Sequence, residues 1–200
     1  MLDRSLPYKS LYMRRPEALP LPPLPTLPGG FFARAFQPGD EAHWARIERS
    51  VGEFPTVPEA LAYFTEHYLP HAGFLAQRCC FIAAPDGLPV ATDTAWRQGE
   101  AHALHWVACD PAYQGRGLGR AAVVHALHRF AGVVPPPIWL HTQTWSHRAV
   151  RLYHDLGFRL VRRGALPYGT ENEYDEGMAI LGAVYPPEIF AQLAGASQEN

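Results

Sequence analysis

The chain has few of the features that mark membrane-spanning, secreted or nucleic-acid-binding proteins. It contains no apolar run of roughly 18 residues, which argues against a membrane-spanning helix. Charged residues make up only 18% of its 200 residues, and a net charge of −2 argues against binding nucleic acid through bulk charge. Lysine is almost absent, because 16 of the 17 basic residues are Arg. We attribute this bias to a GC-rich genome and derive no function from it.

Cysteine is scarce as well. Cys79, Cys80 and Cys109 cannot all pair, and none of them belongs to a motif with metal-ligand spacing, so we expect no metal. The first ten residues contain Asp3 and no apolar stretch, unlike a secretory signal. These features predict a reduced, cytoplasmic protein that does not bind a membrane.

Apolar residues, by contrast, are abundant. At 48% hydrophobic and 12% aromatic, the chain can build the core of one domain of ordinary size. Seven prolines fall in residues 1–30, which favours an extended N-terminal arm lying across the body. We assign 31–182 to the domain itself and 183–200 to a C-terminal extension with a frayed tail.

Hydrophobic periodicity within 31–182 switches repeatedly between the strand and the helix period. We expect strands at 31–36, 78–84, 88–97, 100–109, 138–144, 158–163 and 176–181, and helices at 40–50, 57–68, 119–131 and 147–156. Asp40, after Pro38-Gly39, should cap the first helix. The pattern predicts an α/β fold, with a mixed sheet and helices on both of its faces.

A glycine-rich loop lies between an expected strand end and an expected helix start. Gly115, Gly117 and Gly119 allow the backbone to approach a ligand and to turn its N–H groups towards it, and the helix dipole adds a positive field. The 41 residues from Gln114 to His154 contain no Asp or Glu but five Arg and five His. This composition indicates an anionic ligand with several phosphates.

Two other phosphate-binding loops fit less well. A P-loop requires a Lys after its glycines, and none follows here. A dinucleotide-binding fold could use Gly117, Gly119 and Ala122, but no acidic residue stands about 20 positions later to bind the ribose.

The loop resembles the Gln/Arg-x-x-Gly-x-Gly/Ala signature of GCN5-related N-acetyltransferases, matched here by Gln114, Gly117 and Gly119. Downstream, Ser146-x-x-Ala149-x-x-x-Tyr153-x-x-x-Gly157-Phe158 resembles the second motif of that family, in which Asn often stands in place of Ser146. The resemblance implies a mostly antiparallel sheet of six or seven strands. It also implies transfer of an acetyl group from acetyl-CoA to a primary amine, by direct attack of the amine on the thioester.

The resemblance implies roles for particular residues. Tyr153 would protonate the departing thiolate, and His105 would remove the proton of the amine, as a similarly placed histidine does in arylalkylamine acetyltransferases. The remaining candidates would hold acetyl-CoA. The pantetheine and thioester would be bound by Val107, Ala108 and Cys109, and Ser146 would contact a further part of the cofactor. The pyrophosphate would be bound by Gln114, Gly115, Arg116, Gly117, Leu118, Gly119 and Arg120.

More than one group could remove the proton of the amine. An unperturbed imidazole titrates near pH 6.5, which suits His105, whereas His102 should face the other side of the strand. Glu53 or a chain of water molecules could serve instead. Cys109 has no evident His and Asp partners, so we expect a structural role for it.

The acceptor is less defined. We expect a small-molecule or peptide amine and no nucleic acid, and a homodimer stays open. Six aromatic residues could line an acceptor site, although core packing is the simpler role for most: Trp44, Tyr63, Phe64, Trp96, Trp106 and Trp145. The alternative function is a non-catalytic acyl-CoA-binding or interaction module that has kept the same fold.

Overall fold

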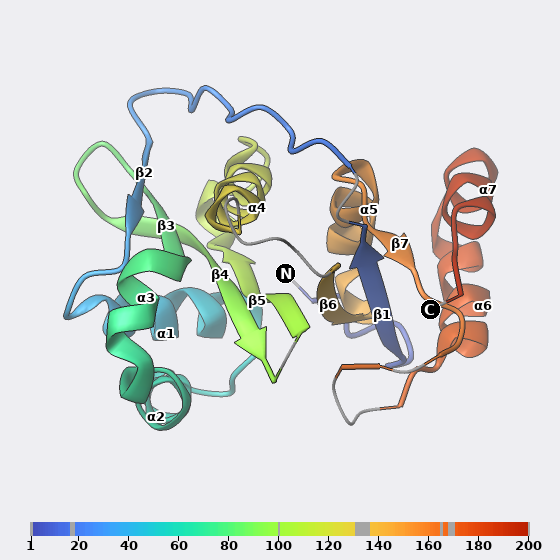
Figure 1. Ribbon diagram of the computed structural model, residues 1–200, viewed down its shortest axis with the longest axis horizontal. Coiled ribbons are helices and arrows are strands. Elements are labelled where there is room, and N and C mark those ends of the chain that lie inside the picture. The colour runs from blue at the N-terminus through green and yellow to red at the C-terminus, as the bar shows by residue number, and fades with distance from the viewer. Residues whose placement is uncertain are drawn as a thin grey trace. The chain divides into compact units, whose positions relative to one another are not determined.

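The computed structural model describes residues 2–16, 19–99, 101–130, 137–164, 166–167 and 171–199 (Figure 1). The strands are β1 (Ser10–Arg15), β2 (Phe32–Ala35), β3 (Cys79–Ala83), β4 (Pro89–Gln98), β5 (Ala101–Cys109), β6 (Ile138–Gln143) and β7 (Arg159–Leu160). The α-helices are α1 (Asp40–Val51), α2 (Val57–His67), α3 (Ala72–Arg78), α4 (Leu118–Arg129), α5 (His147–Asp155), α6 (Tyr174–Val184) and α7 (Pro187–Gly195). Three short 3-10 turns are η1 (Leu69–His71), η2 (Pro111–Tyr113) and η3 (Thr144–Ser146).

The strands form one seven-stranded sheet in the order β2-β3-β4-β5-β6-β1-β7. β3 is antiparallel to β2 and β4, and β1 is antiparallel to β6 and β7. The pairing of β5 with β6, through His102–Ile138 and Ala103–Trp139, is parallel. The predicted mixed, mostly antiparallel sheet is therefore confirmed.

The chain divides into two compact units, and the first comprises the described parts of Leu21–Trp96 and Leu104–Val134. Its core has two layers because successive side chains of β3 point to opposite faces of the sheet. Cys79 and Phe81 pack with buried residues of α1 and α2, such as Trp44 and Phe64. On the other face, Cys80 and Ile82 pack with buried residues of α4, namely Leu118, Ala121 and Ala122. The predicted helices on both faces are present in this unit (Figure 1).

The second unit comprises the described parts of Leu2–Pro20, Arg97–Ala103 and Pro135–Asn200. In this unit β1 lies between β6 and β7, and Tyr12 packs with Trp139 and Val161. Helix α6 packs closely against β1, since a Cβ atom built at Gly177 would lie 2.7 Å from Leu11 Cδ2. A side chain at residue 177 would therefore require the Leu11 side chain or the helix to shift.

Two local predictions are wrong. The strand expected at 176–181 is part of helix α6, because a short apolar run has no clear period and Asp175 and Glu176 suit the first turn of a helix. The N-cap of α1 is Gly39, at φ 99°, and not Asp40. The Asp40 carboxylate instead accepts a hydrogen bond from the Gln37 N–H at 2.7 Å and pairs with Arg34 at 2.6 Å.

Several elements were not predicted from the sequence, namely β1 inside the proline-rich segment and the helices α3 and α7. The tail expected to be frayed is partly paired, because the Gln198 N–H donates to Leu160 O at 2.9 Å. In the part of the chain that the structure describes, no helix is both long and apolar enough to cross a membrane.

Candidate active site

The glycine loop leads directly into helix α4 and leaves its backbone open. Gly117 is the N-cap of α4, at φ 79°, and Gly115 has the same φ, a conformation that L side chains rarely adopt. Both residues are exposed, and a Cβ atom built at either would meet no atom within 4 Å. The first turn of α4 contains no acidic residue. The amide groups at this helix end are therefore accessible to an anion.

The segment before the loop is held by hydrogen bonds. The Asp110 carboxylate accepts from the Ala112 N–H at 3.0 Å and forms an ion pair with Arg46 at 2.6 Å. The Gln114 side chain donates from Nε2 to the carbonyl oxygen of Cys109 at 2.9 Å. Gln114 thus braces the loop from the surface of the protein, and its side-chain amide is engaged in this hydrogen bond.

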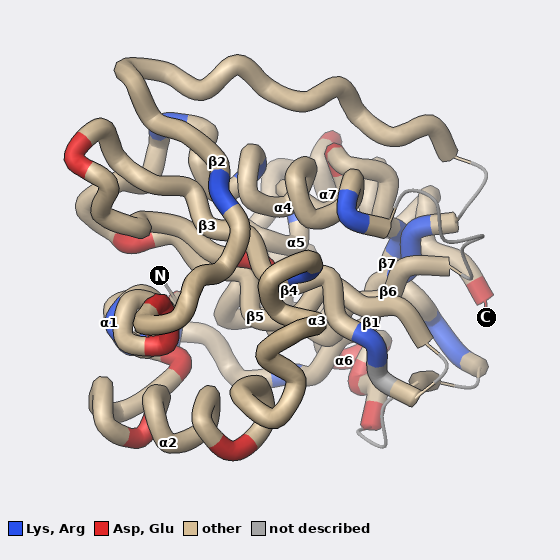
Figure 2. The backbone as a smooth tube through the Cα atoms, turned by 60° about the vertical axis from the view of Figure 1, so that its left-hand side comes forward, with Lys and Arg blue, Asp and Glu red and all other residues tan. Residues whose placement is uncertain are grey.

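Two arginines lie in the loop and the first turn of α4. The Arg116 guanidinium lies 5.5 Å from the ring centroid of Tyr113 and 6.0 Å from that of Phe31. Arg120 is exposed on α4, a helix that contains Arg but no Asp or Glu (Figure 2). Leu118 is buried against the sheet, and a Cβ atom at Gly119 would make only an ordinary 3.7 Å contact with Cys109 Cβ. Of these residues, Leu118 alone has a side chain withdrawn into the core.

The last part of β5 departs from regular strand geometry. Among the described residues, Trp106 is the one non-glycine residue with positive φ, at 54°. Such backbone strain persists where the surrounding structure enforces it, and it is frequent at functional sites. Val107 and Cys109 follow and are half-buried, while Ala108 is buried. Burial raises the pKa of the Cys109 thiol to about 11, so the thiol stays protonated, as suits a structural residue.

His105 precedes this strained segment and is held by an aromatic partner that the sequence analysis missed. Its Nδ1 is hydrogen-bonded to the hydroxyl group of Tyr68, and the two rings stack with centroids 5.8 Å apart. Tyr68 follows α2 as its C-cap residue, and burial raises the pKa of its phenol well above the usual range. No spacing rule links residues 37 positions apart on a helix end and a strand, so the sequence gives no signal for this pair.

Two carboxyl groups are buried in the same unit. Glu48 on α1 and Asp93 on β4 are fully buried, and desolvation raises the pKa of each well above its ordinary value. Among the described residues, the carboxyl oxygens of Glu48 have no hydrogen-bond partner. Glu53, the alternative base, is half-buried, and its charge further raises the pKa of Glu48.

Ser146 and Tyr153 belong to the second unit. Ser146 is the N-cap of α5 and makes no side-chain capping bond. Tyr153 is buried on the same helix, with its ring 6.0 Å from that of Phe158 in an edge-on arrangement. His102, the residue expected to face away, is buried and lies in the second unit. Within the described residues, no group of three or more His, Cys, Asp or Glu could hold a metal ion.

Comparison with known families decides the classification. The model of the acetyltransferase (GNAT) family matches residues 43–158, which include β5, the glycine loop, α4 and α5. The chain belongs to the GNAT acetyltransferase family. The resemblance drawn from the two motifs is thereby confirmed.

Curated relatives in this family include mycothiol acetyltransferases. The chain is 34% identical over 157 residues to the protein of Thermomonospora curvata, covering 74% of this chain and 50% of that protein. It is 31% identical over 184 residues to the protein of Acidothermus cellulolyticus, covering 84% of this chain and 54% of that protein. The chain thus spans about half the length of the curated relatives it matches.

Solved structures share the fold. A GCN5-related N-acetyltransferase from Sphaerobacter thermophilus matches with a TM-score of 0.61 and 24% identity, over 78% of this chain and 49% of that one. A GNAT-family acetyltransferase from Colwellia psychrerythraea matches with a TM-score of 0.58 and 10% identity, over 80% of this chain and 55% of that one. At these identities the likeness establishes the GNAT fold.

Proposed function

We propose that the protein is an acetyl-CoA-dependent N-acetyltransferase that acts on a primary amine. The observation that carries this proposal is the open N-terminus of α4 directly after the strained end of β5, in a chain of the GNAT family. Backbone N–H groups from Gly115 to Arg120, with the side chains of Arg116 and Arg120, would bind the pyrophosphate of acetyl-CoA.

In the proposed reaction the amine nitrogen attacks the carbonyl carbon of the thioester. A C–N bond forms, the C–S bond breaks, the amine loses a proton and the thiolate gains one. N–H groups of Val107, Ala108 and Cys109 would stabilise the negative charge that develops on the carbonyl oxygen. Tyr153 would protonate the thiolate, and Ser146 would contact the cofactor from the start of α5. His105, Glu53 and water are the candidates for the proton of the amine.

The acceptor is proposed from the relatives. Because mycothiol acetyltransferases match about three quarters of this chain or more, mycothiol-related small amines are the first acceptors to test, ahead of peptide amines. The relatives are about twice as long as the matched region, so the proposal concerns only the class of amine that is acetylated.

The test separates binding from turnover. Calorimetry should detect acetyl-CoA binding, and bound cofactor should raise the melting temperature by linkage. Release of free thiol across an amine panel should then identify the acceptor. Absence of binding by the folded protein would contradict the cofactor assignment. Binding without thiol release for any amine would instead favour the non-catalytic acyl-CoA-binding module.

A further inference from the structure

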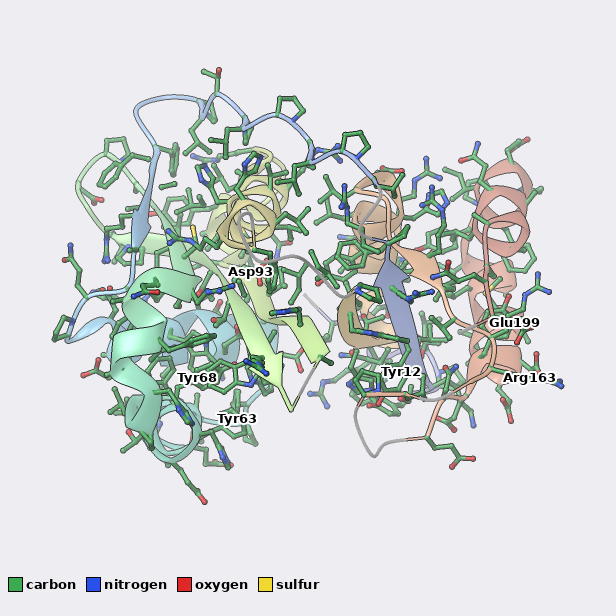
Figure 3. All side chains as sticks on the ribbon, viewed as in Figure 1. Tyr12, Tyr63, Tyr68, Asp93, Arg163 and Glu199 are labelled. Carbon is green, nitrogen blue, oxygen red and sulfur yellow. The ribbon has the colours of Figure 1, made fainter. Side chains whose placement is uncertain are left out.

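The hydroxyl group of Tyr68 is enclosed in the first unit. Tyr68 is 1% exposed and is surrounded by the rings of Trp44, Phe64 and Trp96, at centroid distances of 5.9, 5.1 and 4.6 Å. It lies with Tyr63 on the side of β4 where α2 and α3 are found (Figure 3). Among the described residues, Nδ1 of His105 is the only hydrogen-bond partner of this hydroxyl.

The direction of this hydrogen bond follows from which of the two groups has a proton to donate. Desolvation keeps the phenol of Tyr68 protonated by raising its pKa, and four neighbouring groups act in the same sense: Tyr63, Cys79, Glu48 and Asp93. The hydroxyl therefore has a proton to donate, and a buried donor without an acceptor carries the full desolvation penalty. Nδ1 can accept this proton only if it carries none itself.

We propose that Tyr68 is a positioning residue that fixes the tautomer of His105. The Tyr68 hydroxyl donates to Nδ1, and the proton of the neutral imidazole is held on Nε2. The hydrogen bond made by one ring nitrogen thus decides what the other presents. In a Ser-His-Asp triad the partner of Nδ1 is a carboxylate, which accepts from Nδ1–H and leaves Nε2 free to take a proton. A tyrosine that donates produces the opposite tautomer.

This tautomer changes the role of His105 in the proposed reaction, and this part of the inference rests on the proposed function. In this tautomer neither nitrogen of the neutral ring has a lone pair available to take the proton of the amine. The proton of the amine leaves to Glu53 or to water, the two alternatives already considered.

The tautomer can be read by NMR without any enzyme assay. Nitrogen-15 imidazole spectra of the folded chain, recorded at about pH 8 where an ordinary histidine is neutral, distinguish protonated from unprotonated ring nitrogens. His105→Gln identifies the signals of His105 among those of the ten histidines. We expect a protonated Nε2 and a hydrogen-bonded, unprotonated Nδ1. A protonated Nδ1 in the parent protein would overturn the inference.

Two matched variants test the cause. Tyr68→Phe keeps the ring and removes the donor, so the Nδ1 resonance of His105 should shift. Tyr63→Phe removes the hydroxyl that accepts from Trp106 Nε1 at 3.3 Å, and it should leave both His105 resonances in place. An unchanged Nδ1 resonance in Tyr68→Phe would also overturn the inference. If Tyr68→Phe fails to fold, the parent spectrum alone still decides the tautomer.

Kinetics then connect the tautomer to the reaction. Tyr68→Phe should lower kcat about 3- to 10-fold, the effect of one lost hydrogen bond, with little change in acetyl-CoA affinity. A parent protein without acetyltransferase activity would contradict the proposed function and leave the NMR result standing. A parent protein with activity and a protonated Nδ1 would refute the tautomer and leave the function standing.

Discussion

The helices α4 and α5 both begin within the same acid-free stretch of sequence, but their N-termini are used differently. Gly117 at the start of α4 is exposed and has no atom near the position of a side chain. At the start of α5, other residues of the same chain contact Trp145 and His147. The backbone N–H of Asp3 donates to the Trp145 carbonyl at 2.8 Å, and its carboxylate lies 3.5 Å from His147 Nε2. Tyr185 also donates its hydroxyl proton to the carbonyl oxygen of His147.

The difference shows that the absence of acids does not by itself locate an anion site. A helix N-terminus attracts negative charge whether the charge belongs to a ligand or to the protein. At α5 the carboxylate of Asp3 lies close to the first helical residue. At α4 the first turn contains no acid and the glycines leave the backbone uncovered, so the larger contribution to phosphate binding is expected there.

The strongest test of this contrast is Gly117→Asp. A carboxylate at the N-cap of α4 would oppose the phosphates, so acetyl-CoA should bind at least about 100-fold more weakly, a loss of roughly 2.7 kcal/mol. Isothermal titration calorimetry measures the affinity, and circular dichroism checks that the variant is folded.

Gly117→Asn is the matched control for this variant. Asn has nearly the same size as Asp, tolerates positive φ and carries no charge, so it should retain more affinity than Asp. Equal losses for Asp and Asn would assign the effect to volume. Parent-like affinity in both variants would exclude the α4 terminus as the phosphate site.

The second test asks what α5 contributes to the reaction. We expect Tyr153 to protonate the departing thiolate. Tyr153→Phe should therefore lower kcat by about 10²- to 10⁴-fold, the usual range for a lost general acid. Acetyl-CoA affinity should stay within about twofold, because the proton is needed in the transition state. Steady-state kinetics and calorimetry on the same preparation measure both. A kcat equal to that of the parent would reduce Tyr153 to a packing residue.

The contrast also explains which features the sequence could predict. The glycine loop and α4 follow from local signals: glycines at a strand-to-helix turn and apolar residues at helical spacing. The approach of Asp3 to the His147 side chain joins residues 144 positions apart, which no local rule anticipates. The pair Tyr68–His105 and strand β1 were missed for the same reason. Prolines around β1 signal an extended chain but do not identify its partner strands.

The third test concerns the buried carboxyl groups of the first unit. Helix α4 contains no acidic residue, but α1 and β4 carry the buried Glu48 and Asp93. The raised pKa of Glu48 keeps its carboxyl protonated in the folded state at a pH where the unfolded chain ionises. Its contribution to stability is therefore complete below its ordinary pKa and is lost as the pH rises.

Glu48→Gln removes this proton linkage. Between about pH 5 and pH 8, the melting temperature of the variant should fall less than that of the parent, by roughly 2–4 °C for each kcal/mol of linkage in a domain of this size. Because the charge of Asp93 contributes to the raised pKa of Glu48, the difference between the two melting curves reports Glu48 together with its coupling to Asp93. Parallel pH dependences would show that the Glu48 carboxyl ionises freely in the fold.

The smallest expected effect is that of Ser146→Ala, which tests how much the N-terminus of α5 contributes to cofactor binding. Ser146 makes no capping bond to α5, so its removal should cost little helix stability. If α5 contributes little to cofactor binding, acetyl-CoA affinity should fall by less than about 3-fold, the effect of one weak hydrogen bond. Asp3→Asn is the paired variant, because it removes the carboxylate from His147 and leaves Ser146 in place. Calorimetry on both variants gives the measurement. A loss for Ser146→Ala as large as that for Gly117→Asp would show that both helix ends bind the cofactor equally.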